Sequence, residues 1–247
     1  MHALKSLFTP VDIASTVIFR IAFGAIMLWE VWRYATYGWI ASSYIDPVFY
    51  FTYPGFGWVR PWAGDGMYVF FAVMGLVAVC IMLGLYYRVA IILFFGMFSY
   101  LFLLDQANYL NHFYLVCLLS FVMIFVPAQR AWSLDALWGS ARLTPTIPAW
   151  ALWLLRGQIA VPYFFGGIAK LNGDWLRGEP MRMWLAARTD FPVIGMWFTE
   201  EWMVYLFSYG GLLFDLLIVP LLLWRRTRWA ALAVAIGFHL TNYGLFE

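Results

Sequence analysis

Apolar stretches about as long as a bilayer is thick recur along the whole of this chain of 247 residues. A helix needs about 20 mostly apolar residues to cross the hydrocarbon core, where it satisfies its own backbone polar groups. Seven segments approach that length: about Ile13–Tyr34, Met67–Tyr86, Val89–Leu104, Leu110–Val126, Trp150–Ala169, Trp202–Trp224 and Trp229–Phe246. The sequence therefore predicts an all-α fold, a polytopic transmembrane bundle of about seven spans in a single domain over residues 1–247.

The composition excludes an ordinary soluble domain. Hydrophobic residues make up 64% of the chain and charged residues only 11%, whereas soluble domains average about 25% charged residues. The net charge of +2 and the lack of any basic run argue against a nucleic-acid partner. Cys80 and Cys117 both fall inside apolar segments, so we interpret them as buried hydrophobic side chains. We therefore expect the chain to be embedded in the lipid bilayer.

Two longer connections, residues 35–66 and 171–201, are rich in Trp, Tyr and Phe with scattered charges. This mixture is typical of interfacial helices at the level of the lipid headgroups. The basic residues of the other connections suggest the orientation, because short cytoplasmic loops are enriched in Lys and Arg. One side receives Lys5, Arg88, Arg130, Arg142, Arg225, Arg226 and Arg228. We expect that side, with the amino terminus, to be cytoplasmic, and the location to be the bacterial inner membrane.

Unusual polar residues gather toward the other, outer face. Lys170 ends the fifth span, with Asn172, Asp174 and Trp175 just beyond it. Asn108, Asn111 and His112 lie at the start of the fourth span, and His239 and Asn242 lie in the outer half of the seventh. Polar clusters from three helices at one face predict a membrane-embedded pocket. Its candidate ligand-binding residues are Asn108, Asn111, Asn242, Trp175 and Asp174.

Lys170 is the strongest single candidate for catalysis. An ammonium near hydrocarbon costs about 2.5–3.5 kcal/mol on insertion scales, so a lysine there indicates a function by default. Dry surroundings favour the neutral amine, which can act as a base. A purely structural role is the alternative. Lys170 would then reach the headgroups, His112 would be an interfacial histidine bonded to a carbonyl group, and His239 would form a contact between helices. We expect Lys170→Ala to leave the bundle intact and to abolish turnover.

Three further charges are interpreted as structural. Asp215 lies near the middle of its helix and needs a cation, for which Arg156 and Arg20 are the candidates. A metal site is not expected. The three histidines, His2 included, form no HExxH motif and no Cys/His ligand spacing.

At these residues the chain resembles a known family. Asn108-Tyr-Leu-Asn111-His112-Phe-Tyr-Leu and Trp132-Ser-Leu-Asp135 resemble the Asn-His-x-Tyr-Leu and Trp-Ser-x-Asp patterns of vitamin K-dependent γ-glutamyl carboxylases.

Gly167-Ile-Ala-Lys170-Leu-Asn-Gly-Asp174-Trp175 is similar to their Gly-x-x-Lys-Leu-Asp-x-Asp-Trp segment. The helix with Asp215, and His239 followed by Asn242, look like two of their later helices. Three motifs in register, from about residue 20 to the terminus, resemble the wider family of horizontally transferred transmembrane (HTTM) domains, to which the carboxylases belong.

The resemblance implies a mechanism. A neutral lysine, here Lys170, would act as base toward vitamin K hydroquinone or a related quinol, with oxygen and carbon dioxide as co-substrates and no metal. The oxygenated vitamin would remove a γ-proton from a glutamyl residue of a peptide or protein, and carbon dioxide would trap the carbanion. His112 would orient the vitamin, and His239 matches another histidine implicated in the reaction.

Departures from the pattern leave alternatives open. The family's Lys-Lys doublet is Ala169-Lys170 here, the Asp after the Leu is Asn172, and the Tyr-Ser pair is Glu179-Pro180. The carboxylases also continue into an extramembrane region that holds the glutamyl peptide, whereas this sequence stops at Glu247, just past the last motif. We therefore expect either a truncated form or a bacterial-type relative with another acceptor. A quinol-dependent membrane oxidoreductase without carboxylation and a non-catalytic membrane binding or scaffold module are the alternatives in function.

Overall fold

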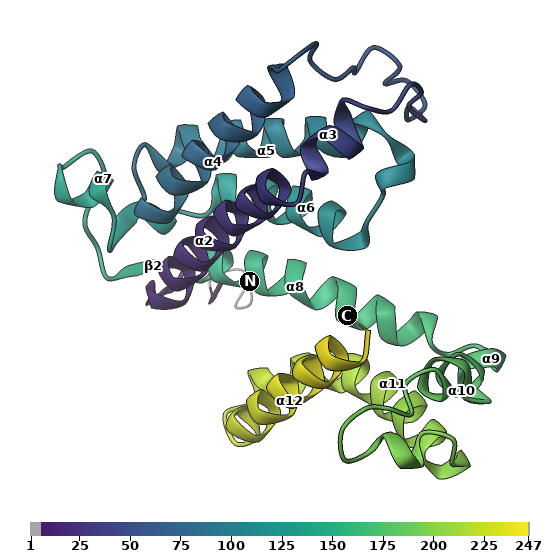
Figure 1. Ribbon diagram of the computed structural model, residues 1–247. Coiled ribbons are helices and arrows are strands. Elements are labelled where there is room, and N and C mark those ends of the chain that lie inside the picture. Colours follow the sequence, from purple (N-terminus) through teal and green to yellow (C-terminus); the bar gives the residue numbers. More distant parts are fainter. Residues whose placement is uncertain (1–5, 247) are drawn as a thin grey trace. The chain divides into compact units, whose positions relative to one another are not determined.

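The computed structural model describes residues 6–246 and is built almost entirely of helices (Figure 1). His2 and Lys5 lie outside the described residues. The helices are α2 Ala14–Thr36, α3 Trp39–Tyr44, α4 Gly66–Leu83, α5 Tyr87–Leu104, α6 Asn111–Phe125, α7 Leu134–Leu137, α8 Ala149–Ala169, α9 Gly173–Leu176, α10 Glu179–Ala186, α11 Glu201–Leu223 and α12 Arg228–Phe246. Short 3₁₀ turns are η1 Gln106–Asn108, η2 Ala128–Arg130 and η3 Gly195–Trp197, and the strands are β1 Pro10–Asp12 and β2 Thr146–Pro148.

The seven predicted spans coincide with α2, α4, α5, α6, α8, α11 and α12, and their ends agree to within a few residues. By length and composition, α2, α4, α5 and α11 are long and apolar enough to cross a membrane, and α6 is a shorter apolar helix. The predicted all-α membrane bundle is confirmed. Short helices also lie in both aromatic connections, α3 in the first and α9 and α10 in the second.

The chain divides into two compact units, which we describe separately. Unit 1 runs to Gln158 and unit 2 begins at Ile159, so the division falls within α8. Unit 1 contains the packing of α2 against α4 and of α5 against α6. Gly24 allows the first of these, because a Cβ atom there would lie 2.6 Å from the Met82 backbone nitrogen. The aromatic side chains of Phe23, Phe94 and Phe98 then fill the space between α2 and α5.

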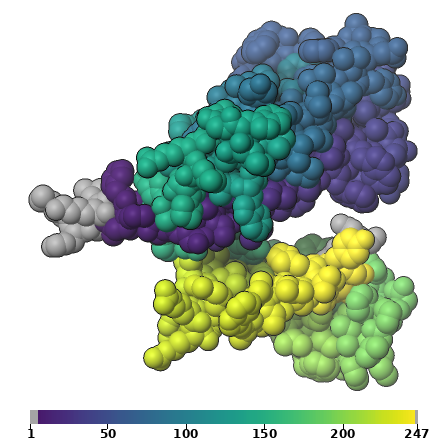
Figure 2. All heavy atoms as spheres, turned by 90° about the vertical axis from the view of Figure 1, so that its left-hand side faces the viewer, coloured from purple at the N-terminus to yellow at the C-terminus, as the bar shows by residue number. Residues whose placement is uncertain are grey.

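One end of unit 1 is organised by the connection between α6 and α8, and we call it the ribbon end. There β1 pairs antiparallel with β2, with Val11 opposite Ile147. In the space-filling view this connection, in teal, lies beside the purple N-terminal residues (Figure 2). The buried Arg20 guanidinium of α2 donates a hydrogen bond to the Trp132 carbonyl oxygen. The connection therefore contacts both β1 and α2.

Asp135, in the same connection, caps a helix that lies far away in the sequence. Its carboxylate accepts hydrogen bonds from the backbone N–H groups of Tyr86, at 2.8 Å, and Tyr87, at 2.9 Å. These are the first donors of α5, which have no partner within the helix. The Trp-Ser-x-Asp segment thus joins the α4–α5 turn to the chain beyond α6.

Asp135→Ala should lower the free energy of unfolding by about 2 kcal/mol, at the upper end of helix-cap effects, because two N–H groups lose their acceptor. Thermal unfolding in detergent measures the effect. Asp65→Ala is the matched control, since Asp65 occupies the N-cap of α4 without a side-chain capping bond. Equal losses in the two variants would contradict a capping role for Asp135.

The opposite end of unit 1, the loop end, contains the first aromatic connection. The buried Asp105 carboxylate accepts hydrogen bonds from the N–H groups of Phe51, at 3.1 Å, and Ala107, at 3.0 Å. The Gln106 N–H also donates to the Phe51 carbonyl oxygen at 2.7 Å. Asp105 therefore ties residues 45–65 to the end of α5.

Unit 2 packs α10 and η3 against α11 around the buried Met181, Leu185 and Phe198. Arg188, just after α10, donates hydrogen bonds to the carbonyl oxygens of Gly244, at 2.8 Å, and Leu245. A cation at the C-terminus of a helix is favourable because of the helix dipole. The second aromatic connection is thereby attached to the end of α12, and together they enclose the site described next.

Candidate functional site

Lys170, directly after α8, forms an ion pair with Asp215 of α11. Its Nζ atom lies 2.5 Å from Asp215 Oδ2 and 3.4 Å from the Gly166 carbonyl oxygen. The side chains of Lys170 and Asp215 are 23% and 13% exposed, so solvent screens the pair only weakly.

The prediction that Arg20 or Arg156 neutralises Asp215 is therefore wrong, because Lys170 is the cation bound to this carboxylate. Arg20 instead binds the Trp132 carbonyl oxygen within unit 1, and the Arg156 guanidinium lies 5.3 Å from the centre of the Trp153 ring. The sequence contained a signal for the observed pair: Lys170 and Asp215 are both central to the family-like motifs.

Two glycines allow the ion pair to form. A Cβ atom on Gly167 would lie 2.5 Å from Leu216 Cδ2 and 3.2 Å from the Leu216 backbone nitrogen. A Cβ atom on Gly166 would lie 3.2 Å from Asp215 Oδ2. The Gly-Gly pair therefore lets α8 approach α11 closely, one helical turn before the lysine.

The ion pair lines a cavity of about 380 Å³ in unit 2, which we call the Lys170 cavity. Its lining consists of Lys170, Trp175, Met181, Trp184, Phe207, Gly211, Asp215, Phe238 and Asn242. A neighbouring hollow of about 240 Å³ shares Phe207, Gly211, Phe238 and Asn242 with it. One charged pair and one amide thus face a mainly aromatic space.

Trp175 forms a fixed wall of the cavity. Its indole N–H donates to the Ser208 carbonyl oxygen at 2.8 Å, and the Ser208 hydroxyl donates to the Trp175 carbonyl oxygen at 2.5 Å. Asn172 caps α9 by accepting a hydrogen bond from the Trp175 N–H at 2.9 Å. The Lys170 Nζ atom lies 5.0 Å from the centre of the Trp175 ring, within cation–π range.

His239 lies beside the cavity wall rather than in the lining. Its Nε2 atom is 3.0 Å from the Tyr163 hydroxyl oxygen, and its ring meets Phe214 edge-on. Phe214 stacks on the cavity residue Phe238, with ring centres 3.8 Å apart. Tyr163 was not among the candidate residues, because a tyrosine in an apolar helix gives no distinctive signal.

Asp174 faces solvent instead of the cavity. Its carboxylate forms an exposed ion pair with Arg177 three residues later, at 2.6 Å. An exposed pair at this spacing contributes little to stability. Asp174 is therefore placed away from the cavity, unlike its neighbours Lys170 and Trp175.

The remaining candidates belong to the loop end of unit 1. Asn111 and His112 begin α6, Asn108 ends η1, and all three side chains are exposed. The His112 ring contacts the ring of Phe113 edge-on. That His112 joins Lys170 and His239 in one pocket stays a prediction.

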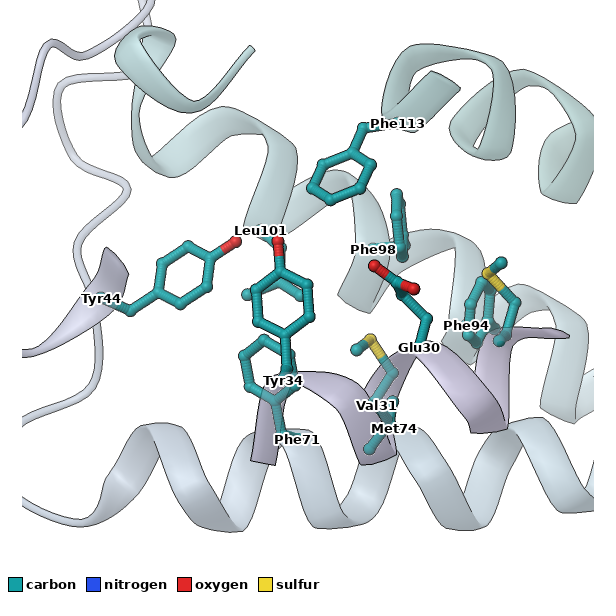
Figure 3. A pocket seen from close by; sticks show the side chains of 11 residues that line it. Glu30, Val31, Tyr34, Tyr44, Phe71, Met74, Phe94, Phe98, Leu101 and Phe113 are labelled. Atoms are coloured by element: carbon teal, nitrogen blue, oxygen red, sulfur yellow. The ribbon is translucent and has the colours of Figure 1, made fainter. Parts of the chain in front are cut away.

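Unit 1 also contains a small aromatic pocket that sequence analysis did not indicate. Figure 3 shows the carboxylate of Glu30 and the hydroxyl groups of Tyr34 and Tyr44 directed into it, among phenylalanine rings. Glu30 Oε2 lies 3.1 Å from Arg33 Nη1, and burial raises the pKa of Tyr44 above its ordinary value. The volume, about 20 Å³, corresponds to roughly one water molecule. Of these two pockets, only the Lys170 cavity has room for a ring-sized ligand.

The Lys170–Asp215 contact can hold or move a proton. An amine and a carboxyl group in hydrogen-bond contact exist either as an ion pair or, after one proton crosses, as two neutral groups. Aromatic walls limit the access of water that would otherwise screen the pair. The arrangement suits proton abstraction from an aromatic ligand with a polar edge.

Comparison with known protein families matches residues 8–247 to the HTTM domain. The matched range extends across both units of the structure. No solved structure matches the chain.

Proposed function

Since the chain belongs to the HTTM domain family, we propose that it is an integral-membrane enzyme that oxygenates a quinol bound in the Lys170 cavity. The resemblance to vitamin K-dependent carboxylases extends the proposal to coupled carboxylation of glutamyl residues. The single observation that carries the proposal is the Lys170–Asp215 ion pair on the wall of an aromatic cavity.

The cavity suits a quinol in size and in chemistry. Its volume of about 380 Å³ falls within the range of small-molecule sites, about 300–1,000 Å³. Trp175, Trp184 and Phe238 offer ring faces and edges for stacking on a planar aromatic ligand. Asn242 offers both a donor and an acceptor to a quinol oxygen. An apolar quinol could enter directly from the lipid phase.

Each residue of the cavity has a role in this proposal. Lys170, with its amine neutral, takes a proton from the hydroxyl group of the quinol. The neutral amine forms when Asp215 first accepts the proton of the ion pair across the 2.5 Å contact. After the amine takes the quinol proton, Lys170 is an ammonium beside a protonated Asp215. Trp175, whose ring lies beside the Lys170 amine, holds the lysine next to the quinol ring and excludes water from it. The Tyr163–His239 hydrogen bond supports Phe214, which in turn supports Phe238.

The bound quinol supplies the electrons that reduce oxygen: quinol and O₂ give quinone epoxide and water. In the coupled reaction a glutamyl γ-carbon exchanges its proton for carbon dioxide, so that the residue gains a second carboxylate and releases one proton. Atoms and electrons balance in both equations.

The proposal predicts quinol-dependent formation of epoxide by the purified chain in lipid nanodiscs. The assay supplies vitamin K hydroquinone, oxygen and labelled carbon dioxide, with and without a glutamyl peptide, and chromatography measures epoxide and labelled peptide. Asp174→Asn is the matched control for the cavity carboxylate Asp215, because Asp174 carries the same negative charge outside the cavity. The Asp174→Asn variant should retain full activity.

The outcomes separate the three candidate functions. Epoxide with peptide labelling supports the carboxylase, and oxidised quinol without labelling supports an oxidoreductase. If the chain neither bound nor oxidised the quinol, that result would contradict both enzyme functions. A membrane binding or scaffold module would then be the remaining function.

A further inference from the structure

At the ribbon end of unit 1, far from the Lys170 cavity in sequence, two arginines face a polar pocket of about 270 Å³. Its lining consists of Phe8, Pro10, Arg130, Arg142, Thr144, Thr146, Ile147 and Pro148. The lining includes two guanidinium groups and two hydroxyl groups, and no carboxylate. Such a set of donors is suited to an oxyanion.

The pocket has a defined backbone frame. The Arg130 carbonyl oxygen accepts a hydrogen bond from the Thr144 N–H at 3.1 Å, which joins the two ends of the loop around α7. The ribbon of β1 and β2 supplies the opposite wall, and the Ile13 N–H donates to the Pro145 carbonyl oxygen at 3.0 Å. Both arginines are thus attached to ordered segments rather than to a free loop.

The positive charge of the pocket is not neutralised locally. In the part of the chain from residue 6 to 246, neither Arg130 nor Arg142 has a carboxylate within 4.0 Å. Asp12 lies opposite Thr146 in the ribbon, but it lines a different pocket and accepts a hydrogen bond from the Ala14 N–H. Arg88, at the start of α5, adds a third positive charge that acts on Arg130.

The ribbon end is also where several apolar helices begin or end. It contains the starts of α2, α5 and α8 and the ends of α4 and α6, and therefore the ends of several apolar helices. The exposed apolar side chains of Phe8 and Leu143, 69% and 71% exposed, flank the arginines. A basic pocket between span ends, bordered by apolar side chains, matches the amphipathic head of a phospholipid.

We propose that Arg130 and Arg142 bind a phosphate group at the ribbon end, with the Thr146 hydroxyl group as a further donor. The Thr144 hydroxyl instead donates to the Thr146 carbonyl oxygen at 3.3 Å, which holds the loop in place. Guanidinium groups bind phosphate through paired, charge-assisted hydrogen bonds. The phosphate belongs to the headgroup of an anionic phospholipid, because the pocket opens where the spans end. This inference is independent of the reaction proposed for the Lys170 cavity.

The test measures thermal unfolding of the full chain in neutral detergent during titration with phosphatidylglycerol, phosphatidylcholine or inorganic phosphate. Native mass spectrometry counts the retained lipids in parallel. Phosphatidylglycerol should raise the melting temperature and stay bound. Its affinity should fall about fivefold for each arginine changed to Gln, the equivalent of about 1 kcal/mol per charge.

Arg225→Gln/Arg226→Gln is the matched control, because it removes the same two charges from the α11–α12 connection, outside this pocket. The control should bind phosphatidylglycerol as the parent chain does, whereas Arg130→Gln/Arg142→Gln should bind it about 25-fold more weakly. An arginine-dependent response to inorganic phosphate alone would support the phosphate site and assign it to a soluble phosphate compound. Equal losses in both double variants, or no response to either anion, would overturn the proposal.

Discussion

Lys170→Met should abolish quinol-dependent turnover and also destabilise the protein. Turnover should fall by about 10²–10⁴-fold, the usual contribution of a general base. The free energy of unfolding should fall by about 3 kcal/mol, because the mutation leaves the mostly buried Asp215 carboxylate without its cation. Epoxide formation and thermal unfolding measure the two effects. The expectation that replacing Lys170 would spare the bundle is revised, because the side chain is an ion-pair partner.

The double variant Lys170→Met/Asp215→Leu separates these effects. Replacing both charges by apolar side chains removes the unpaired carboxylate, so stability should return to about that of the parent chain. Turnover should stay absent, because the base is still missing. Recovery of turnover in the double variant would contradict catalysis by Lys170.

Gly167→Ala should have the second largest effect, although the change adds a single methyl group. The new Cβ atom would lie 2.5 Å from Leu216 Cδ2 and 3.2 Å from the Leu216 backbone nitrogen, so Leu216 of α11 must shift, and Asp215 beside it is displaced from Lys170. Overpacking of this kind costs about 1–3 kcal/mol. Displacing a catalytic group by about 1 Å can lower the rate about 10²-fold. Unfolding and the rate of epoxide formation are measured on the same sample.

Gly157→Ala provides the control within the same helix. A Cβ atom on Gly157 meets no other atom within 4 Å, so alanine should be tolerated and should stabilise α8 by up to about 1 kcal/mol. If Gly167→Ala behaved like Gly157→Ala, the close approach of α8 and α11 would have no part in forming the site.

The number and limits of the long helices could be predicted from the sequence, because the length of an apolar run directly reflects the bilayer thickness. All seven predicted spans match helices of the structure. The two-strand ribbon could not be predicted, since Pro10–Asp12 and Thr146–Pro148 are too short to show a strand pattern and pair only across a long separation.

The candidate site was predictable in part. Lys170, Trp175 and Asn242 were singled out as polar or aromatic residues at one face of the membrane, and all three line the cavity. The partner of Asp215 was assigned incorrectly because hydropathy gives the depth of a residue and not the direction of its side chain. The glycines before Lys170 leave room for Asp215 and Leu216, and this effect depends on the neighbouring helix α11.

Aspartates in the connections were harder to interpret. In the sequence, Asp105 follows the third predicted span, just before the polar residues of the fourth, and Asp135 entered only through a motif. In the structure both carboxylates bind backbone N–H groups of segments about 50 residues away in the sequence, at Phe51 for Asp105 and at Tyr86 and Tyr87 for Asp135. Such long-range caps leave no local trace in the sequence.

The cap formed by Asp135 has a consequence for biosynthesis. The chain of α4 and α5 is synthesised before residue 135, so the N–H groups of Tyr86 and Tyr87 gain this acceptor only after the chain beyond α6 has been made. Unit 1 can complete its fold only after the chain beyond α6 has been made and Asp135 has reached the start of α5. The start of α5 is therefore finished by a connection that is made later than α6, the next long helix in the chain.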